Sequence, residues 1–243
     1  MDRQGSVAIV GAGDFIGAAI ARRFAAGGYR VHGGRRQGDK LAPLAEEIAE
    51  AGGRFTGHTL DARTEEGIAA FLAAAEAEAP LSAVIFNVGA NVNFPVLETT
   101  ERVFRKVWEM ACYAGFLTGR EAARRMGPRG AGSIFFTGAT ASLRGGSGYA
   151  AFAAAKFGLR AVAQAMAREL GPQGLHVAHL VIDAGVDTAW VRGRIAEREG
   201  ADAIAPGRLM EPASIAETYW MLHHQPRDAW THELDLRPQG ERW

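Results

Sequence analysis

The feature that most constrains this chain is a glycine-rich turn between a short apolar run and an amphipathic pattern. Val7–Val10 is entirely apolar, as expected of a central parallel strand buried on both faces. The segment GAGDFIG follows it, and a helix is predicted from about Ile16 to Ala26. In this context Gly11 permits a tight turn, Gly13 lets the backbone approach a pyrophosphate, and Gly17 lets the helix pack closely on the strand. These residues therefore predict a dinucleotide-binding turn.

The rest of the chain repeats the alternation of strand and helix. Strands are predicted over 30–34, 54–60, 83–86, 132–136, 176–182 and 233–236, and helices over 40–51, 64–77, 100–126, from near 150 to 170 and over 212–224. Strands that alternate with helices at this spacing form a parallel sheet with right-handed crossovers. We expect an α/β fold, with a doubly wound parallel sheet of about seven strands and helices on both faces. Residues 1–243 are predicted to form a single domain, with the polar, irregular segment 188–208 as a substrate lid.

The composition of the chain argues against several classes of partner and of bound group. The 27 basic residues (Lys and Arg) balance the 27 acidic ones, so no basic field favours nucleic acid or a membrane surface. The single Cys112 allows no intramolecular disulfide and fits a reducing compartment. No apolar run approaches transmembrane length, and the histidines show no zinc-binding spacing. We expect a cytoplasmic protein without a metal site.

The end of the second predicted strand bears on the choice of cofactor. An acidic side chain there would bind the ribose 2′-hydroxyl and repel a 2′-phosphate. Gly34 is followed instead by Arg35 and Arg36, which favour a phosphate through charge-assisted hydrogen bonds. The alternative is that both arginines only cap the strand end. We therefore expect NADP(H) to be preferred, with NAD(H) possible.

Several motifs occur in the order and spacing of one known family. They are GAGDFIG at 11–17, Asp61, Asn87-Val88-Gly89, Lys156 and Val186-Asp187-Thr188. Over essentially its whole length, and most closely over 143–170, the chain resembles the short-chain dehydrogenase/reductase family. The resemblance implies a Rossmann fold, a nicotinamide cofactor, carbonyl or alcohol chemistry on a small molecule, and a homodimer or homotetramer.

The resemblance also implies roles for individual residues along the cofactor. The turn would hold the pyrophosphate, with Phe15 where the family usually has glycine and Asp14 where many NADP-using members have a basic residue. Asn87 would brace the sheet beside the cofactor. Asp61 and Ala62 would meet the adenine, and Val186 and Thr188 would bind the carboxamide of the nicotinamide. The full set of implied cofactor-binding residues is Gly11, Gly13, Asp14, Phe15, Ile16, Gly17, Arg35, Arg36, Asp61, Ala62, Asn87, Val88, Gly89, Lys156, Val186 and Thr188.

Most of the family's catalytic set is absent. The family uses a tyrosine as proton donor, a lysine four residues later, a serine thirteen residues before the tyrosine and an asparagine on the preceding helix. Lys156 is present, but the other three positions hold Phe152, Ala139 and Ala111. Loss of a general acid removes a factor of about 10²–10⁴, and loss of an oxygen-stabilising donor about 10²–10³. The scaffold that positions a cofactor against its substrate is expected to remain.

Two side chains near Phe152 are candidates to replace the missing proton and hydrogen-bond donors. Tyr149 precedes it by three residues, so the two share a face if both are helical. The alternative for Tyr149 is packing or substrate contact. Thr140 is a candidate contact for a substrate oxygen, or else a loop hydroxyl bonded to backbone. The expected substrate pocket lies between Ala139, Thr140, Phe152 and the lid, with Trp190 as a wall.

Three functions follow from this sequence. The first is an atypical NADP-dependent oxidoreductase that takes its proton from water, the substrate or Tyr149, or acts on a substrate that needs little acid assistance. The second is a catalytically silent NADP-binding protein, either a sensor or an assembly subunit. The third is non-redox chemistry on the same scaffold. The preserved dinucleotide residues favour the first two, and the apolar replacements favour the second over a conventional reductase.

Overall fold

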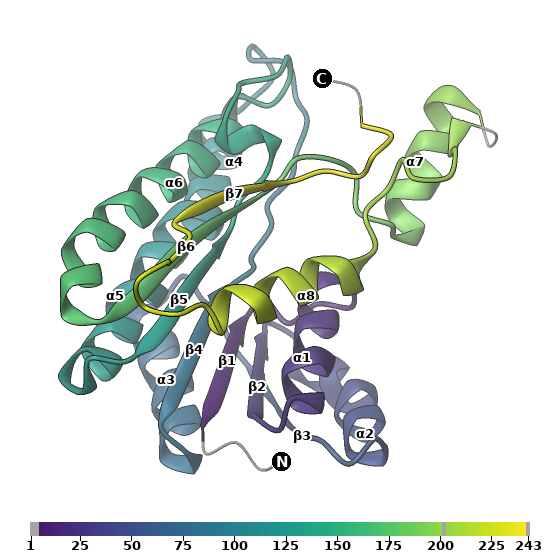
Figure 1. Cartoon of the computed structure of the whole chain (residues 1–243). Helices are drawn as coiled ribbons and strands as arrows, with labels where there is room; N and C mark the ends of the chain where they lie inside the picture. Colours follow the sequence, from purple (N-terminus) through teal and green to yellow (C-terminus); the bar gives the residue numbers. More distant parts are fainter. Residues whose placement is uncertain (1–4, 201–202, 242–243) are drawn as a thin grey trace.

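A computed structural model describes residues 5–200 and 203–241, and it has one parallel sheet at its centre (Figure 1). The strand order is β3-β2-β1-β4-β5-β6-β7. This is the doubly wound arrangement expected from the alternating sequence. The strands are β1 (Ser6–Val10), β2 (Arg30–Arg35), β3 (Arg54–Thr59), β4 (Leu81–Phe86), β5 (Gly132–Thr137), β6 (Leu175–Ile182) and β7 (Glu233–Leu236).

Helices cover both faces of the sheet (Figure 1). One face carries α1 (Ile16–Ala26), α2 (Ala42–Glu50) and α8 (Pro212–His223), and the other carries α3 (Glu65–Glu78), α4 (Glu101–Trp108), α5 (Ala114–Met126) and α6 (Ala150–Leu170). None of the helices in the described residues is long and apolar enough to cross a bilayer. The cytoplasmic location expected from composition stays a prediction.

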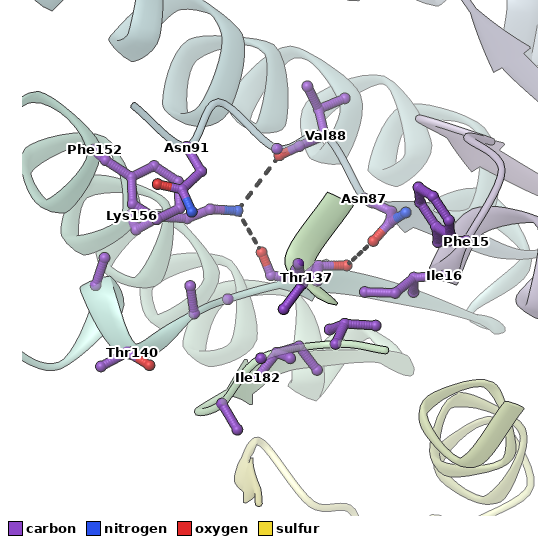
Figure 2. A pocket seen from close by; sticks show the side chains of 18 of the residues that line it. Phe15, Ile16, Asn87, Val88, Asn91, Thr137, Thr140, Phe152, Lys156 and Ile182 are labelled. Carbon is purple, nitrogen blue, oxygen red and sulfur yellow. Dashed lines mark hydrogen bonds between the residues drawn. The ribbon is translucent and has the colours of Figure 1, made fainter. Parts of the chain in front are cut away.

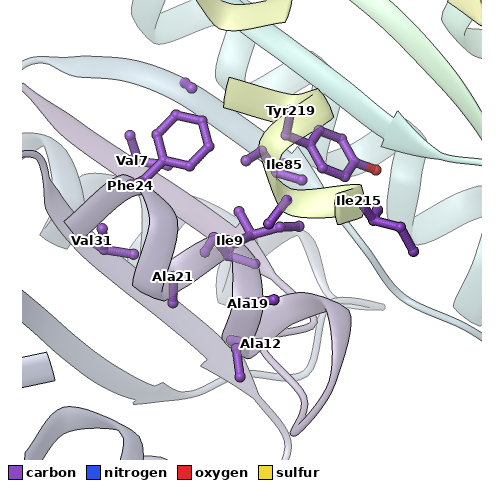
Figure 3. Packing of buried hydrophobic residues seen from close by; sticks show 14 of the residues in the cluster. Val7, Ile9, Ala12, Ala19, Ala21, Phe24, Val31, Ile85, Ile215 and Tyr219 are labelled. Atoms are coloured by element: carbon purple, nitrogen blue, oxygen red, sulfur yellow. The ribbon is translucent and has the colours of Figure 1, made fainter. Parts of the chain in front are cut away.

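The central strand β1 owes its apolar sequence to burial on both faces of the sheet. Along β1, Val7 and Ile9 pack toward α1 and α8, where Phe24 and Tyr219 close the core (Figure 3). The alternate residues of β1 pack toward the opposite helices. Because side chains of a strand alternate between faces, a strand covered on both sides needs apolar residues at every position.

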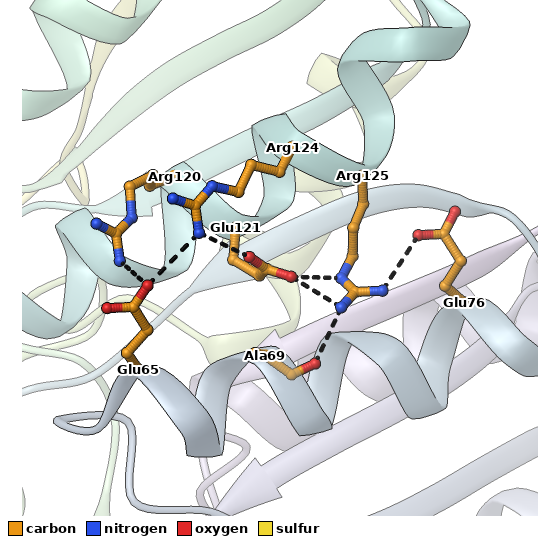
Figure 4. A network of polar contacts seen from close by, with 7 residues as sticks. All are labelled: Glu65, Ala69, Glu76, Arg120, Glu121, Arg124 and Arg125. Carbon is orange, nitrogen blue, oxygen red and sulfur yellow. Dashed lines mark hydrogen bonds and ion pairs between the residues drawn. The ribbon is translucent and has the colours of Figure 1, made fainter.

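Ion pairs join α3 to α5 on the outer side of the sheet (Figure 4). Glu65 lies 2.6 Å from Arg120, and Arg125 lies 3.8 Å from Glu76. Arg125 also donates to the Ala69 carbonyl oxygen at 3.2 Å. Single exposed ion pairs contribute little to stability. Their arrangement in one network fixes the position of α3 along α5.

The segment 188–208 contains a helix, so the expectation that it is irregular was wrong. α7 spans Ala189–Glu199, and the Thr188 side chain caps it by accepting from the Val191 N–H at 3.0 Å. The helix has no buried residue. It therefore lacks the apolar face by which a helix is identified in a sequence. Residues 201–202 of the expected lid lie outside the described part of the chain.

The helix expected over 100–126 is present, but it is not a regular α-helix throughout. A π-helical turn, Glu109–Tyr113, separates α4 from α5. It contains Ala111 and Cys112, which are both buried. Apolar spacing does not distinguish one wide turn from a regular helix, and such turns occur often at functional sites.

The reversal of strand order between β1 and β4 determines where a ligand can bind. On either side of this point the chain crosses to opposite faces of the sheet, which leaves a crevice at the carboxyl ends of the strands. The loops that follow β1, β4, β5 and β6 meet at this crevice.

Candidate active site

Two adjoining cavities occupy the crevice, with volumes of about 770 Å³ and about 540 Å³. The larger one is shown in Figure 2. Both are lined by Gly11, Gly13 and Asn87-Val88-Gly89, so they form one groove that is continuous past the glycine turn. Every residue that the sequence placed at the cofactor or the substrate lines one of the two cavities, whereas Ala111 is buried and lines neither.

The glycine turn is shaped by close backbone contacts. Gly11 has φ +93°, and a Cβ there would lie 2.7 Å from the Asn87 carbonyl oxygen. A Cβ on Gly17 would lie 2.6 Å from the Gly11 carbonyl oxygen, whereas one on Gly13 would have no atom within 4 Å. The open side of Gly13 faces both cavities, next to the first N–H groups of α1. Unpaired N–H groups at a helix start favour an anion, so this cradle fits a pyrophosphate.

Asn87 connects the glycine turn to the centre of the sheet. Its Nδ2 donates to the Gly11 carbonyl oxygen at 3.1 Å, and its Oδ1 accepts from the Thr137 hydroxyl at 3.0 Å. The Thr137 oxygen lies 2.6 Å from the Tyr219 hydroxyl. Because Thr137 gives its proton to Asn87, Tyr219 must donate to Thr137. Burial raises the pKa of Tyr219 above its usual range, so the phenol stays protonated.

Sequence reasoning did not find Tyr219. It lies on α8, 82 residues after its partner Thr137, and it is fully buried. An aromatic residue in an apolar helical pattern indicates core packing, and nothing in the sequence shows where its hydroxyl points.

Lys156 is the buried cation of the larger cavity. Its side chain is 3% exposed, and its Nζ donates to the Thr137 carbonyl oxygen at 2.8 Å and the Val88 carbonyl oxygen at 3.4 Å (Figure 2). Burial lowers the pKa of Lys156 to about 8, and the nearby Cys112 opposes this shift only partly. An ammonium has three donors, so one remains for a ligand.

The second cavity is lined by charged side chains that are partly paired with one another. Arg35 lies 2.7 Å from Asp14. Arg63 donates to both oxygens of Asp61 at 2.9 and 2.6 Å, and these hydrogen bonds lower the pKa of Asp61 to about 2. Arg36 is exposed and lines the same cavity. Arg63 was not predicted as a site residue, although its position two residues after Asp61 could have indicated it.

Tyr149 is not helical, so the condition for sharing a helical face with Phe152 is not met. It is the N-cap of α6, with φ −109° and ψ 21°, and its carbonyl oxygen accepts from the Ala153 N–H at 2.7 Å. Tyr149 still lines the larger cavity, as do Ala139, Phe152 and the half-exposed Trp190.

Thr140 lies beside the buried carboxylate of Asp183, and its hydroxyl helps to lower the pKa of that carboxyl. Thr140 also lines the larger cavity. The wall formed by Ala139 and Phe152 provides no side-chain donor.

Comparison with known proteins gives the context for this geometry. Residues 6–199 match the model of the short chain dehydrogenase family. A 3-oxoacyl-(acyl-carrier-protein) reductase, MabA of Mycobacterium tuberculosis, is 30% identical over 215 residues, which cover 87% of this chain and 82% of that protein.

Solved structures agree with the sequence matches. A short-chain dehydrogenase from Rhodopseudomonas palustris is 59% identical, with a TM-score of 0.84 over 97% of this chain and 99% of that one. A tryptophan variant of actinorhodin polyketide ketoreductase, crystallised with NADPH, is 25% identical, with a TM-score of 0.87 over 98% of each chain. With this fold, this groove and these matches, the chain belongs to the short-chain dehydrogenase/reductase family, whose members are oxidoreductases that bind nicotinamide cofactors.

Proposed function

We propose that this protein is an atypical NADP-dependent oxidoreductase that transfers hydride between NADP(H) and a small carbonyl or alcohol substrate. The observation that carries this proposal is the continuous groove with Lys156 hydrogen-bonded into its wall. The nicotinamide, when bound, supplies or accepts the hydride. The residues of the chain bind and orient the reactants and exclude water.

Each part of the groove has a role in this proposal. The glycine turn holds the pyrophosphate, and the free donor of Lys156 binds the nicotinamide ribose. Val186 and Thr188 bind the carboxamide, because the Thr188 oxygen accepts from Val191 and its own proton remains available. Arg36 and Arg35 bind the 2′-phosphate, and Asp61 with Ala62 meets the adenine. Asp14 neutralises part of the charge of Arg35, so Arg36 carries more of the preference for NADP.

The apolar wall of the pocket restricts the substrates. Phe152 has no exchangeable proton and Ala139 has no hydroxyl, so the protein supplies little acid assistance there. Carbonyl compounds that become stable anions after accepting hydride, such as quinones and activated diketones, can then take their proton from water. We propose these as the substrate class, with α7 and the rest of the described segment 188–208 acting as the lid of a single domain.

One experiment tests this function. The protein is titrated with NADPH and NADH by fluorescence, and the same sample then receives quinones, activated diketones and ordinary ketones. Tighter binding of NADPH, followed by oxidation that depends on quinone or diketone, is the expected result. Binding of neither nucleotide would contradict the proposal.

The second candidate is a catalytically silent NADP-binding protein. The apolar residues Ala139, Phe152 and Ala111 favour it, because all three remove proton chemistry while the cofactor groove persists. Tight NADPH binding without oxidation of the nucleotide by any carbonyl in the panel would select this function over the first.

We also propose a homo-oligomer, formed through the face made by α4, α5 and α6. Phe104, Trp108, Phe116 and Phe157 are each 36% to 42% exposed there. A Cβ on Gly158 would lie 4.0 Å from Nε1 of Trp108, so α4 packs against α6 at this point. Large exposed aromatic residues gathered on one face are typical of subunit interfaces.

A further inference from the structure

A buried carboxylate at the substrate end of the larger cavity holds two arginines. Asp183 follows β6 directly and is 2% exposed. Its Oδ2 accepts from Arg237 Nε at 2.8 Å, and its Oδ1 from Arg144 Nη2 at 3.3 Å. The hydroxyl of Thr140 lies near this carboxylate and helps to lower its pKa. The cluster thus joins the end of β6, the residue after β7 and the loop before α6.

Asp183 stays charged in this setting. Burial raises its pKa, but the hydrogen bonds from Thr140 and Arg237 outweigh that effect, and the pKa lies below its ordinary value. Removing a carboxylate from water is costly unless it is paired and hydrogen-bonded. Arg237 is mostly buried and also donates to Asp235 at 3.0 Å, so it meets the structural requirement for a counter-charge.

Arg144 differs from Arg237 in its exposure and in where it lies. Its side chain is 57% exposed, and it lines the larger cavity together with Gly145 and Gly146. Its hydrogen bond to Asp183 uses one N–H of the five that a guanidinium carries. The buried Asp183 therefore fixes the direction of Arg144, while most of its donors remain for a ligand.

The other charged groups of this cavity have partners of their own. Lys156 donates to two backbone carbonyl oxygens, and Asp14 is paired with Arg35. Among the described residues that line the larger cavity, Arg144 is thus the cation best placed to bind a charged group on a substrate. Guanidinium groups bind carboxylates in a planar, two-point geometry that lysine cannot reproduce.

We propose that the carbonyl substrate carries a carboxylate, that Arg144 binds this carboxylate, and that Asp183 is the positioning residue for Arg144. The inference rests on the proposed oxidoreductase function and deepens it, because it names a charge that the substrate must bear. It also accounts for a buried acid beside an otherwise apolar pocket wall.

The test compares ligands that differ only in this charge. Benzoylformate, meta-acetylbenzoate and para-acetylbenzoate are each paired with their methyl ester. Binding is measured by calorimetry on protein loaded with NADP⁺, which cannot reduce a ketone, so affinity is read without turnover. The variants are Arg144→Gln, Arg144→Lys and Asp183→Asn, with Arg168→Gln as a matched control, because Arg168 is an arginine on the exposed surface of α6.

For at least one pair, the carboxylate is expected to bind about 10-fold tighter than its ester or more, as a charge-assisted contact implies. Arg144→Gln should remove this ratio, Arg144→Lys and Asp183→Asn should reduce it, and Arg168→Gln should preserve it. Added salt should lower the ratio in the native protein. Equal binding of acid and ester in every pair would overturn the proposal, as would a ratio that survives in Arg144→Gln.

A failure of the proposed carboxylate site can be distinguished from a failure of the proposed oxidoreductase function. If NADP⁺ does not bind, the same titrations are made on protein without nucleotide. A carboxylate preference that depends on Arg144 would then support the anion site although the oxidoreductase function had failed. Oxidation of NADPH by carbonyl compounds without any effect of Arg144 would support the function and reject the anion site.

Discussion

At position 152 a ring without a hydroxyl lies beside a buried lysine, whose Nζ is 5.9 Å from the centre of the ring. Lys156 is held by backbone oxygens rather than by the side chain that the family uses as its acid. Its position therefore does not depend on a tyrosine. If the missing hydroxyls were restored at positions 139 and 152, Lys156 would already be in position beside them.

The first prediction concerns the double variant Phe152→Tyr with Ala139→Ser. We expect it to reduce ordinary ketones about 10²-fold or more faster than the native protein, because a general acid contributes about 10²–10⁴-fold. Initial rates of NADPH oxidation measure the gain. The same variant with Lys156→Met should lose most of it, because the lysine lowers the pKa of the new tyrosine. No gain would mean that the pocket no longer places a ketone at the cofactor.

A second prediction follows from the pKa of about 8 for Lys156, which lies below its ordinary value of 10.5. Between these two values the unfolded chain binds a proton that the folded chain does not, so Lys156 makes the free energy of unfolding rise with pH across this window. Its burial costs most below about pH 8. The variant Lys156→Met lacks this dependence.

Urea unfolding of the native protein and of Lys156→Met, both without nucleotide, measures the effect. From about pH 7 to above pH 10, the native protein should gain up to about 3 kcal/mol relative to the variant. Parallel curves for the two proteins over this range would show that Lys156 is not buried in the folded state.

Motif spacing was sufficient to place individual residues along the groove, but not to give their hydrogen bonds. Gly11 to Gly17, Asn87 and Lys156 follow strand ends or begin helices, so the order of elements brings them together. The hydrogen bond from Arg144 to Asp183 joins residues 39 positions apart. No local pattern indicates such a contact, and the same holds for Tyr219.

At the scale of elements, the contact between α1 and the glycine turn gives a third prediction. A Cβ on Gly17 would lie 2.6 Å from a backbone oxygen, whereas one on Gly13 would meet no atom within 4 Å. Gly17→Ala should therefore destabilise the fold by about 1–3 kcal/mol, as overpacking does. Gly13→Ala should leave the unfolding temperature of the nucleotide-free protein nearly unchanged but weaken NADPH binding, because its methyl group points into the groove.

Thermal unfolding and NADPH titration of both variants check this pair. Each protein serves as the control for the other, since the substitution is the same and only the surroundings differ. Equal losses of stability in the two variants would contradict the contacts described for the turn. An unchanged NADPH affinity in Gly13→Ala would remove the cradle as the pyrophosphate site.

The elements that sequence reasoning predicted well are those with a buried face. Strands such as β1 and β6 and helices such as α1 and α8 have buried residues and follow from their apolar sequences, and their bounds agree within a few residues. α7 has no buried residue, and the π-helical turn at Glu109–Tyr113 changes the hydrogen bonding of a helix without changing its apolar pattern. Apolar periodicity indicates only which residues are buried, so it predicts neither α7 nor the π-helical turn.

For the whole molecule, the aromatic face of α4 to α6 gives a fourth prediction. The double variant Trp108→Glu with Phe157→Glu places two charges on this face, and we expect its molar mass by light scattering to fall below that of the native protein. Met221→Glu is the matched control, because Met221 is 47% exposed on α8, across the sheet. An unchanged mass in the double variant, or the same fall in the control, would reject this face as the subunit interface.

The hydroxyl of Tyr219 ties the last helix of the chain to its first turn, through Thr137 and Asn87. A molecule that rests on the glycine turn therefore restrains α8 without contacting it. Its binding should slow amide hydrogen exchange along α8, and Tyr219→Phe should abolish this protection while the groove itself stays intact. The occupancy of the crevice would then be readable from α8, by exchange alone and without any turnover.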